Sequence, residues 1–154
     1  MMSAREYRPS LDKLLRLCER NYGRLCALLS QARERQGRRR HYLWRHRDEP
    51  LQLEIVILEQ TPYTERLKVR RLAPPLPFVN APELELRLYH DARVAEVLSG
   101  QQFLRLLPRY PYPNRRMLQR DEKFQVNLFL AELLEQFAQH EWQLVSLSEE
   151  KGRS

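Results

Sequence analysis

The middle of the chain alternates apolar and polar side chains with a period of two, which is the pattern of a β-strand with one buried face. The alternation is clearest in residues 51–58 and 84–88, where leucine or isoleucine occupies every second position. Shorter versions of it occur in residues 41–47, 67–71 and 102–106. Turn-forming or proline-rich segments separate most of these stretches, so the sequence predicts about five mostly antiparallel strands.

One of these strands is expected to be long and bent. Apolar residues continue on both sides of His90 and Asp91, so residues 84–97 are predicted to form a single strand that is broken at this pair. The segment before it, residues 73–82, contains four prolines in ten residues. Because proline cannot donate to a sheet ladder and also breaks a helix, we expect an ordered crossing loop there.

Both ends of the chain follow the helical period instead. Residues 11–32 place apolar side chains three and four positions apart behind a capping Ser10, and residues 126–137 repeat this spacing. We expect the second helix to begin between residues 118 and 121 and to end near His140. Three of its side chains are predicted to be buried: Leu130, Leu133 and Phe137.

Together these patterns predict an α+β fold, in which an N-terminal helix, about five mostly antiparallel strands and a C-terminal helix packed on the sheet follow one another. A chain of 154 residues is long enough for one hydrophobic core and too short for two. We therefore expect residues 1–154 to form a single domain, whose ordered core spans roughly residues 7–147.

The net charge of +7 lies entirely in the first third of the chain. Residues 1–50 contain 13 Lys and Arg against 6 Asp and Glu, whereas residues 51–154 contain 14 of each. A basic surplus of this kind suits an anionic partner such as a nucleic acid. Because 23 of the 27 basic residues are arginine, a compositional bias of the genome explains the surplus equally well.

The sequence argues against a secreted or membrane protein. Residues 1–9 are polar and lack the apolar centre of a signal peptide, and the longest aliphatic run covers only residues 55–58. The two cysteines, Cys18 and Cys26, would lie about 12 Å apart on one helix, which is too far for a disulfide. Free cysteines fit a reducing compartment, so we expect a cytoplasmic protein. Nothing in the sequence places a base beside either thiol.

No pattern in the sequence indicates a metal or a cofactor. The histidines, at positions 41, 46, 90 and 140, do not have the spacing of metal ligands, and His41 and His46 are expected on opposite faces of a strand. The four glycines are scattered, which argues against the glycine-rich loops that cradle phosphates. We therefore expect neither a metal nor a cofactor.

The strongest candidate for a binding site is a loop rich in arginine and tyrosine before the second helix. Arginine offers bidentate donors to phosphate or carboxylate, tyrosine offers a stacking face, and prolines limit the freedom of the loop. A helix N-terminus would favour an anion at the same place. The residues expected to converge there are Arg109, Tyr110, Tyr112, Asn114, Arg120 and Lys123. The alternative is a structural loop, in which the tyrosines pack on the sheet and Arg120 pairs with Asp121 or Glu122.

A second candidate consists of His90, Asp91 and Glu96, which are side chains able to perform acid–base chemistry. If the strand is regular, His90 shares a face with the leucines of residues 84–88. A hydrogen-bonded core histidine is then favoured over a general base.

Several stretches of the sequence resemble the YqiB-like family, a domain of unknown function from Gram-negative bacteria. They are residues 17–22, residues 87–97, and residues 109–114 together with 119–123 and Asn127. The resemblance extends from about residue 7 to residue 145, and the connector 33–40 and the tail after Trp142 depart from it. It implies a small cytosolic bacterial protein, and it implies no activity and no catalytic residues.

The sequence leaves three interpretations of function open. The first is a small non-enzymatic binding or regulatory protein that recognises an anionic ligand, namely a nucleic acid, a nucleotide or an acidic protein. The second is a small enzyme that uses residues such as His90, Asp91, Glu96 or Glu122 for acid–base chemistry. The third is a protein-binding adaptor, because two helices can leave one face of the sheet open to a partner.

Overall fold

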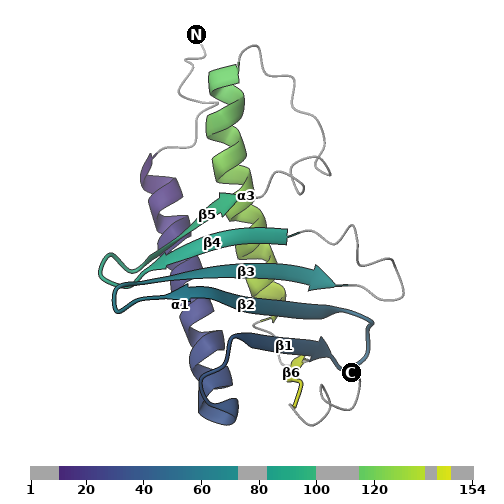
Figure 1. The fold of residues 1–154 in the computed structure, drawn as a ribbon. Helices are drawn as coiled ribbons and strands as arrows, with labels where there is room; N and C mark the ends of the chain where they lie inside the picture. The colour runs from purple at the N-terminus through teal and green to yellow at the C-terminus, as the bar shows by residue number, and fades with distance from the viewer. Residues whose placement is uncertain (1–10, 73–82, 100–114, 138–141, 147–154) are drawn as a thin grey trace.

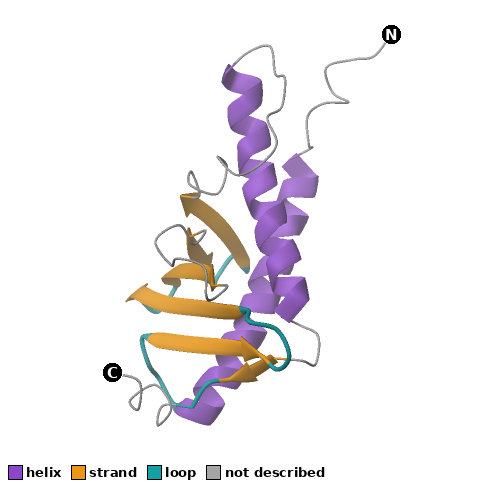
Figure 2. Ribbon diagram, turned by 90° about the vertical axis from the view of Figure 1, so that its right-hand side faces the viewer, coloured by secondary structure: helices purple, strands orange, loops and turns teal. Residues whose placement is uncertain are grey.

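The computed structural model describes residues 11–72, 83–99, 115–137 and 142–146. In chain order the described elements are α1 (Leu11–Gln36), β1 (His41–His46), β2 (Gln52–Gln60), β3 (Thr64–Leu72), β4 (Glu83–Tyr89), β5 (Val94–Ser99), α3 (Arg115–Phe137) and β6 (Trp142–Leu144). These strands form one antiparallel sheet in the order β5-β4-β3-β2-β1-β6. Both helices lie on the same side of the sheet, as Figures 1 and 2 show. The predicted α+β class is confirmed.

The hydrophobic core lies between this sheet and the two helices. In the strands, every second residue faces the helices and is buried, as the alternation predicts. The side chains that β2 and β4 contribute are Leu53, Ile55, Ile57, Leu84, Leu86 and Leu88. The three side chains predicted to be buried in the C-terminal helix, Leu130, Leu133 and Phe137, are part of the same core.

The stretch predicted to be one long bent strand is two strands. β4 ends at Tyr89, residues 90–93 form a turn, and β5 begins at Val94, directly opposite Tyr89. Arg93 permits this reversal because it adopts the left-handed conformation, with φ of 59°, that glycine usually takes. Its amide donates to the carbonyl of Tyr89 at 2.7 Å. The expected bend is therefore wrong, and the chain reverses at this point.

The helices are longer than the apolar pattern indicates. α1 continues to Gln36, past the expected end at Ala32, and α3 begins at Arg115. Neither helix, over its described length, is long and apolar enough to cross a membrane.

β6 pairs with β1 and has no counterpart among the predicted strands. The predicted strand at residues 102–106 and the proline-rich loop at 73–82 lie outside the described residues.

A buried amide joins α1, α3 and the outer edge of the sheet. The side-chain oxygen of Asn127 in α3 accepts the backbone amide of Val97 in β5 at 3.3 Å. The backbone carbonyl of Asn127 accepts the side-chain amide of Asn21 in α1 at 3.0 Å. β5 is the outer strand of the sheet within the described residues, and Asn127 satisfies one of its backbone amides while it positions α3.

The face of the sheet that points away from the helices is covered mainly by charged side chains. Cations of β3 pair there with glutamates of the neighbouring strands: Arg66 with Glu85, Lys68 with Glu83, and Arg70 with Glu54, each at 2.7 Å. His41 lies on this face and contacts Glu54, whereas His46 contacts Trp142, so the two histidines point to opposite faces as predicted. None of the described helices covers this second face.

The packing of α3 can be tested by truncating one core side chain. We expect Leu133→Ala to lower the free energy of unfolding by about 2–5 kcal/mol, because it removes buried contacts and leaves a cavity. The matched control is Glu132→Ala, at the exposed neighbouring position, which should change the free energy by less than about 0.5 kcal/mol. Urea titration measures both changes, and equal effects of the two substitutions would contradict this packing.

Candidate functional site

Most of the predicted arginine–tyrosine loop lies outside the described residues, and so its convergence stays a prediction. This applies to Arg109, Tyr110, Tyr112 and Asn114. Arg120 lies in the second turn of α3, and its side chain is also outside the described part. Lys123 is described, and its ammonium lies 3.4 Å from the carboxylate of Glu96, with both side chains largely exposed. An anion near Lys123 would compete with this carboxylate.

The second set of candidates, His90, Asp91 and Glu96, is not joined by direct contacts. His90 faces α1 and contacts Tyr22 and Glu65. Asp91 is exposed in the turn between β4 and β5. Because Glu96 contacts Lys123 instead, the structure shows no acid–base pair among these three side chains.

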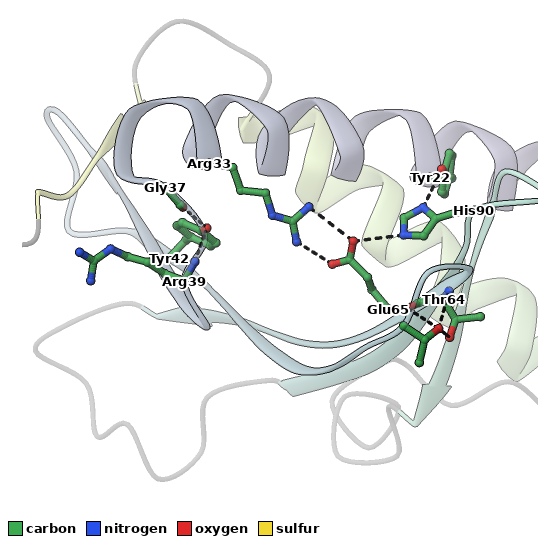
Figure 3. Close-up of polar contacts among 9 residues, drawn as sticks. Tyr22, Arg33, Gly37, Arg39, Tyr42, Thr64, Glu65 and His90 are labelled. Atoms are coloured by element: carbon green, nitrogen blue, oxygen red, sulfur yellow. Dashed lines mark hydrogen bonds and ion pairs between the residues drawn. The ribbon is translucent and has the colours of Figure 1, made fainter.

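A network of four polar side chains crosses the interface between α1 and the sheet (Figure 3). The hydroxyl of Tyr22 lies 2.9 Å from Nδ1 of His90, and Nε2 of His90 lies 3.1 Å from the carboxylate of Glu65. The guanidinium of Arg33 donates to both oxygens of that carboxylate, at 2.7 and 3.4 Å. Glu65 is only 4% exposed, so this ion pair is largely removed from water. Tyr22 and Arg33 come from α1, which the network therefore ties to β3 and to the turn after β4.

The network engages both ring nitrogens of His90. Arginine can only donate, so Glu65 accepts from Arg33 as a carboxylate. Because a carboxylate only accepts, Nε2 of His90 donates to Glu65, and Nδ1 pairs with the hydroxyl of Tyr22, where either group can be the donor. Burial disfavours the charge of Arg33, but the hydrogen bond and the charge of Glu65 outweigh it and raise the pKa of the guanidinium. Both ring nitrogens of His90 are thus hydrogen-bonded, which makes the side chain an anchor for α1, in agreement with the favoured interpretation of a hydrogen-bonded histidine.

The two cysteines of α1 are thiols at neutral pH. Burial raises the pKa of Cys18 to about 11, and the neighbouring charge of Glu96 acts in the same direction. Burial also raises the pKa of Cys26, although a hydrogen bond with Tyr22 acts against it. Because the thiolate is the nucleophilic form of cysteine, these environments do not activate either side chain. In the described part of the chain, no group of three or more potential ligands could hold a metal ion.

A cluster of four exposed arginines, which we call the arginine corner, marks the end of α1. Its members are Arg35, Arg38, Arg39 and Arg40. Arg35 lies in the last turn of the helix, and the other three lie in the connection to β1. None of the four has an acidic partner among the residues that the structure describes. With the exposed Glu34, residues 34–40 carry a net charge of +3.

Hydrogen bonds fix the backbone of the arginine corner, as Figure 3 shows in part. Gly37 ends the helix in the left-handed conformation, with φ of 77°. The hydroxyl of Tyr42 donates to the carbonyl of Gly37 at 2.7 Å and accepts the amide of Arg39 at 2.9 Å. The amide of Ile57 in β2 donates to the carbonyl of Arg40 at 2.7 Å. Since the ring of Tyr42 is buried in the core, the connection is anchored to the interior of the protein.

Comparison with known proteins identifies the family of this chain. A family model described as a protein of unknown function (DUF1249) matches residues 24–143. The chain belongs to the DUF1249 family. It is 39% identical over 130 residues to the uncharacterized protein YqiB of Escherichia coli K12, which covers 84% of this chain and 89% of the relative. Proteins of the same name from E. coli O6:H1 and O157:H7 match to the same extent. No solved structure matches the chain.

The resemblance to the YqiB-like family is therefore confirmed. The matched region of the DUF1249 model includes the arginine corner and three members of the polar network, Arg33, Glu65 and His90. The family is described as having unknown function. A role for the arginine corner or for the polar network must therefore be inferred from their geometry and charge.

Glu65 is the main residue of the network that the sequence did not single out. It shares the alternation of Leu67 and Val69, so it falls on the face of β3 that points into the core. A carboxylate on that face requires a buried partner. This requirement was the one sign in the sequence that Glu65 belongs to a polar network. The partner, Arg33, lies 32 residues earlier in the chain, where no local pattern could identify it.

The polar network predicts that neutralising the carboxylate of Glu65 destabilises the folded protein. We expect Glu65→Gln to lower the free energy of unfolding by about 1.5–3 kcal/mol, because Arg33 loses its charged partner in a site shielded from water. Glu59→Gln is the matched control, since Glu59 is exposed and lies 3.5 Å from Arg66. It should cost less than about 1 kcal/mol. Denaturant titration of both variants at pH 7 measures the difference, and equal costs would show that the buried ion pair does not fix α1.

Proposed function

We propose that this DUF1249 protein is a non-enzymatic binding protein for an anionic ligand and that the arginine corner forms the binding surface. One observation carries the proposal: four exposed arginines without acidic partners in the described part project from a backbone that hydrogen bonds hold in place. Guanidinium groups offer paired donors that match phosphate and carboxylate oxygens.

The rigidity of the arginine corner favours binding over a purely structural role. Like charges held close together repel one another, and an anion between them would remove this repulsion. A mobile connector would let its arginines separate, whereas the bonds from Tyr42 and Ile57 keep the backbone in one conformation. A ligand then meets donors whose backbone is already ordered, which lowers the entropic cost of binding.

The second face of the sheet provides a contrast within the same molecule. The basic side chains of β3 are paired there with glutamates of β2 and β4. Their charges are locally balanced, so they attract an anion less than the arginine corner does. The same ion pairs make this face unlike the apolar surface that the adaptor interpretation requires.

The predicted loop before α3 is a second candidate surface for the same ligand class. α3 begins at Arg115, directly after Asn114, so the loop residues Arg109, Tyr110 and Tyr112 precede the positive end of the helix dipole. Arg120 and Lys123 follow within the first turns of this helix. The proposed acid–base alternative has less support, because both nitrogens of His90 are already hydrogen-bonded.

Thermal unfolding in the presence of tripolyphosphate tests whether the arginine corner binds anions. We expect the melting temperature of the wild type to rise with tripolyphosphate concentration, because a ligand that binds the folded state stabilises it by mass action. Arg38→Ala/Arg40→Ala should lose most of this rise. Arg16→Ala/Arg20→Ala is the matched control: it removes the same charge from exposed positions of α1 that lie about 22 to 28 Å along the helix from Arg35, and it should retain the rise.

The same measurement on Arg109→Ala/Arg120→Ala separates the two candidate surfaces. If this variant loses the stabilisation and the variant of the arginine corner keeps it, the ligand binds at the loop before α3. If tripolyphosphate does not stabilise the wild type at any concentration, or all variants respond equally, the proposed function is wrong.

A further inference from the structure

We propose, building on the function above, that the anion bound by the arginine corner is the phosphate backbone of a nucleic acid, contacted without stacking of its bases. The inference rests on three features of the corner: the exposure of its arginines, the burial of the nearest tyrosine and tryptophan, and the absence of exposed large apolar side chains in residues 35–40.

Exposure of the arginines favours an extended anion over a small one. All four side chains of the arginine corner face solvent, where each ion pair is weakened by water and salt. A single phosphate or mononucleotide would gain little in such a site. A polymer of phosphates gains more, because each contact releases counterions condensed along its backbone. The arginine corner is therefore better suited to a chain of phosphate groups than to a single phosphate group.

The aromatic residues next to the corner cannot stack on bases. Tyr42 and Trp44 are the tyrosine and tryptophan nearest to the corner in the sequence, and both are buried in the core on the helix-facing side of β1. The imidazole of His41, which directly follows Arg40, is held by Glu54 at 3.0 Å. The hydroxyl of Tyr42 is already engaged in holding the corner. Single-strand binding proteins obtain sequence-tolerant affinity from exposed aromatic platforms, and this surface lacks one among its described residues. Recognition at the corner should therefore depend on phosphates alone.

The composition of the corner distinguishes a nucleic acid from a membrane surface. Segments that bind lipid headgroups usually combine basic residues with apolar side chains that enter the bilayer. The exposed large apolar side chains of the described part are Leu11, Leu15, Tyr63 and Leu98, and none of them belongs to the corner. Arginine, which matches phosphate geometry with two parallel donors, supplies every positive charge of the corner.

This inference predicts a characteristic dependence on salt. For duplex DNA, the logarithm of the binding constant falls with the logarithm of salt concentration by about 0.9 for each phosphate contact. If all four arginines of the corner make contact, the slope should be about −3 to −4. Removing two of them should reduce the slope by about 2 and weaken binding by at least about tenfold at low salt.

Fluorescence anisotropy with two labelled 25-base-pair DNA duplexes of unrelated sequence, measured between 25 and 200 mM KCl, tests this inference. We expect the wild type to bind both duplexes with affinities within about threefold of each other, because the phosphate backbone is common to both. Arg38→Ala/Arg40→Ala should show the reduced slope and affinity. Arg16→Ala/Arg20→Ala, which removes the same charge far from the corner, should keep the slope of the wild type.

Tyr42→Phe tests whether the fixed backbone contributes to binding in addition to the charge of the arginines. This substitution keeps every arginine and the buried ring but removes the hydroxyl that holds Gly37 and Arg39. If the fixed backbone matters, duplex binding should weaken several-fold while the salt slope stays unchanged. Circular dichroism and the melting temperature check that each variant is folded at the temperature of the measurement.

The outcomes separate this inference from the proposed function. If neither duplex binds and tripolyphosphate still stabilises the wild type, the nucleic-acid inference is wrong and anion binding stands. If neither duplex nor tripolyphosphate binds, both proposals fail. More than tenfold preference for one duplex, or equal binding by the corner variant and the wild type, would also overturn the inference. Stronger binding to vesicles containing phosphatidylserine than to DNA would assign the corner to a membrane surface.

Discussion

A buried ion pair docks the C-terminal part of α1 onto the sheet. Arg33 reaches from the helix to Glu65 on the core-facing side of β3, and a carboxylate buried to this extent is tolerated only when it is paired. The backbone carbonyl of the same arginine accepts the amide of Gly37 at 2.8 Å. The residue that docks the helix therefore also bonds to Gly37, whose left-handed conformation ends it. A displacement of Arg33 would move the point where the chain leaves the helix, and with it the arginine corner.

Charge is handled differently in three parts of the molecule. In the interior, Glu65 is satisfied by Arg33 and by His90. On the second face of the sheet, cations and glutamates of neighbouring strands are paired. At the arginine corner, a hydrogen-bonded backbone presents four exposed positive charges together, without acidic partners among the described residues. This imbalance, held in place by a buried tyrosine, is the physical basis of the proposed anion binding.

The alternation of apolar residues was sufficient to predict the sheet, because one face meets the helices and the other carries charge. It failed in residues 84–97, where the turn contains neither glycine nor proline and Arg93 takes the conformation that glycine would signal. It also missed β6, which has three residues and is too short to show a period. The end of α1 was misplaced because its last turn is polar and carries no apolar period. The arginine corner could be seen in the sequence only as a charged connector, since its rigidity depends on the hydroxyl of Tyr42.

Amide hydrogen exchange at the arginine corner tests the central claim, that these arginines project from a fixed backbone. The amide of Arg39 donates to the buried hydroxyl of Tyr42, and the amide of Gly37 donates to the last turn of α1. We predict that both exchange at least about a hundredfold more slowly than unstructured peptide amides, because exchange requires these bonds to open. Exchange of the Arg39 amide at the rate of an unstructured peptide, in a protein whose β2 and β3 amides are protected, would show that the corner is a mobile linker and would contradict this account.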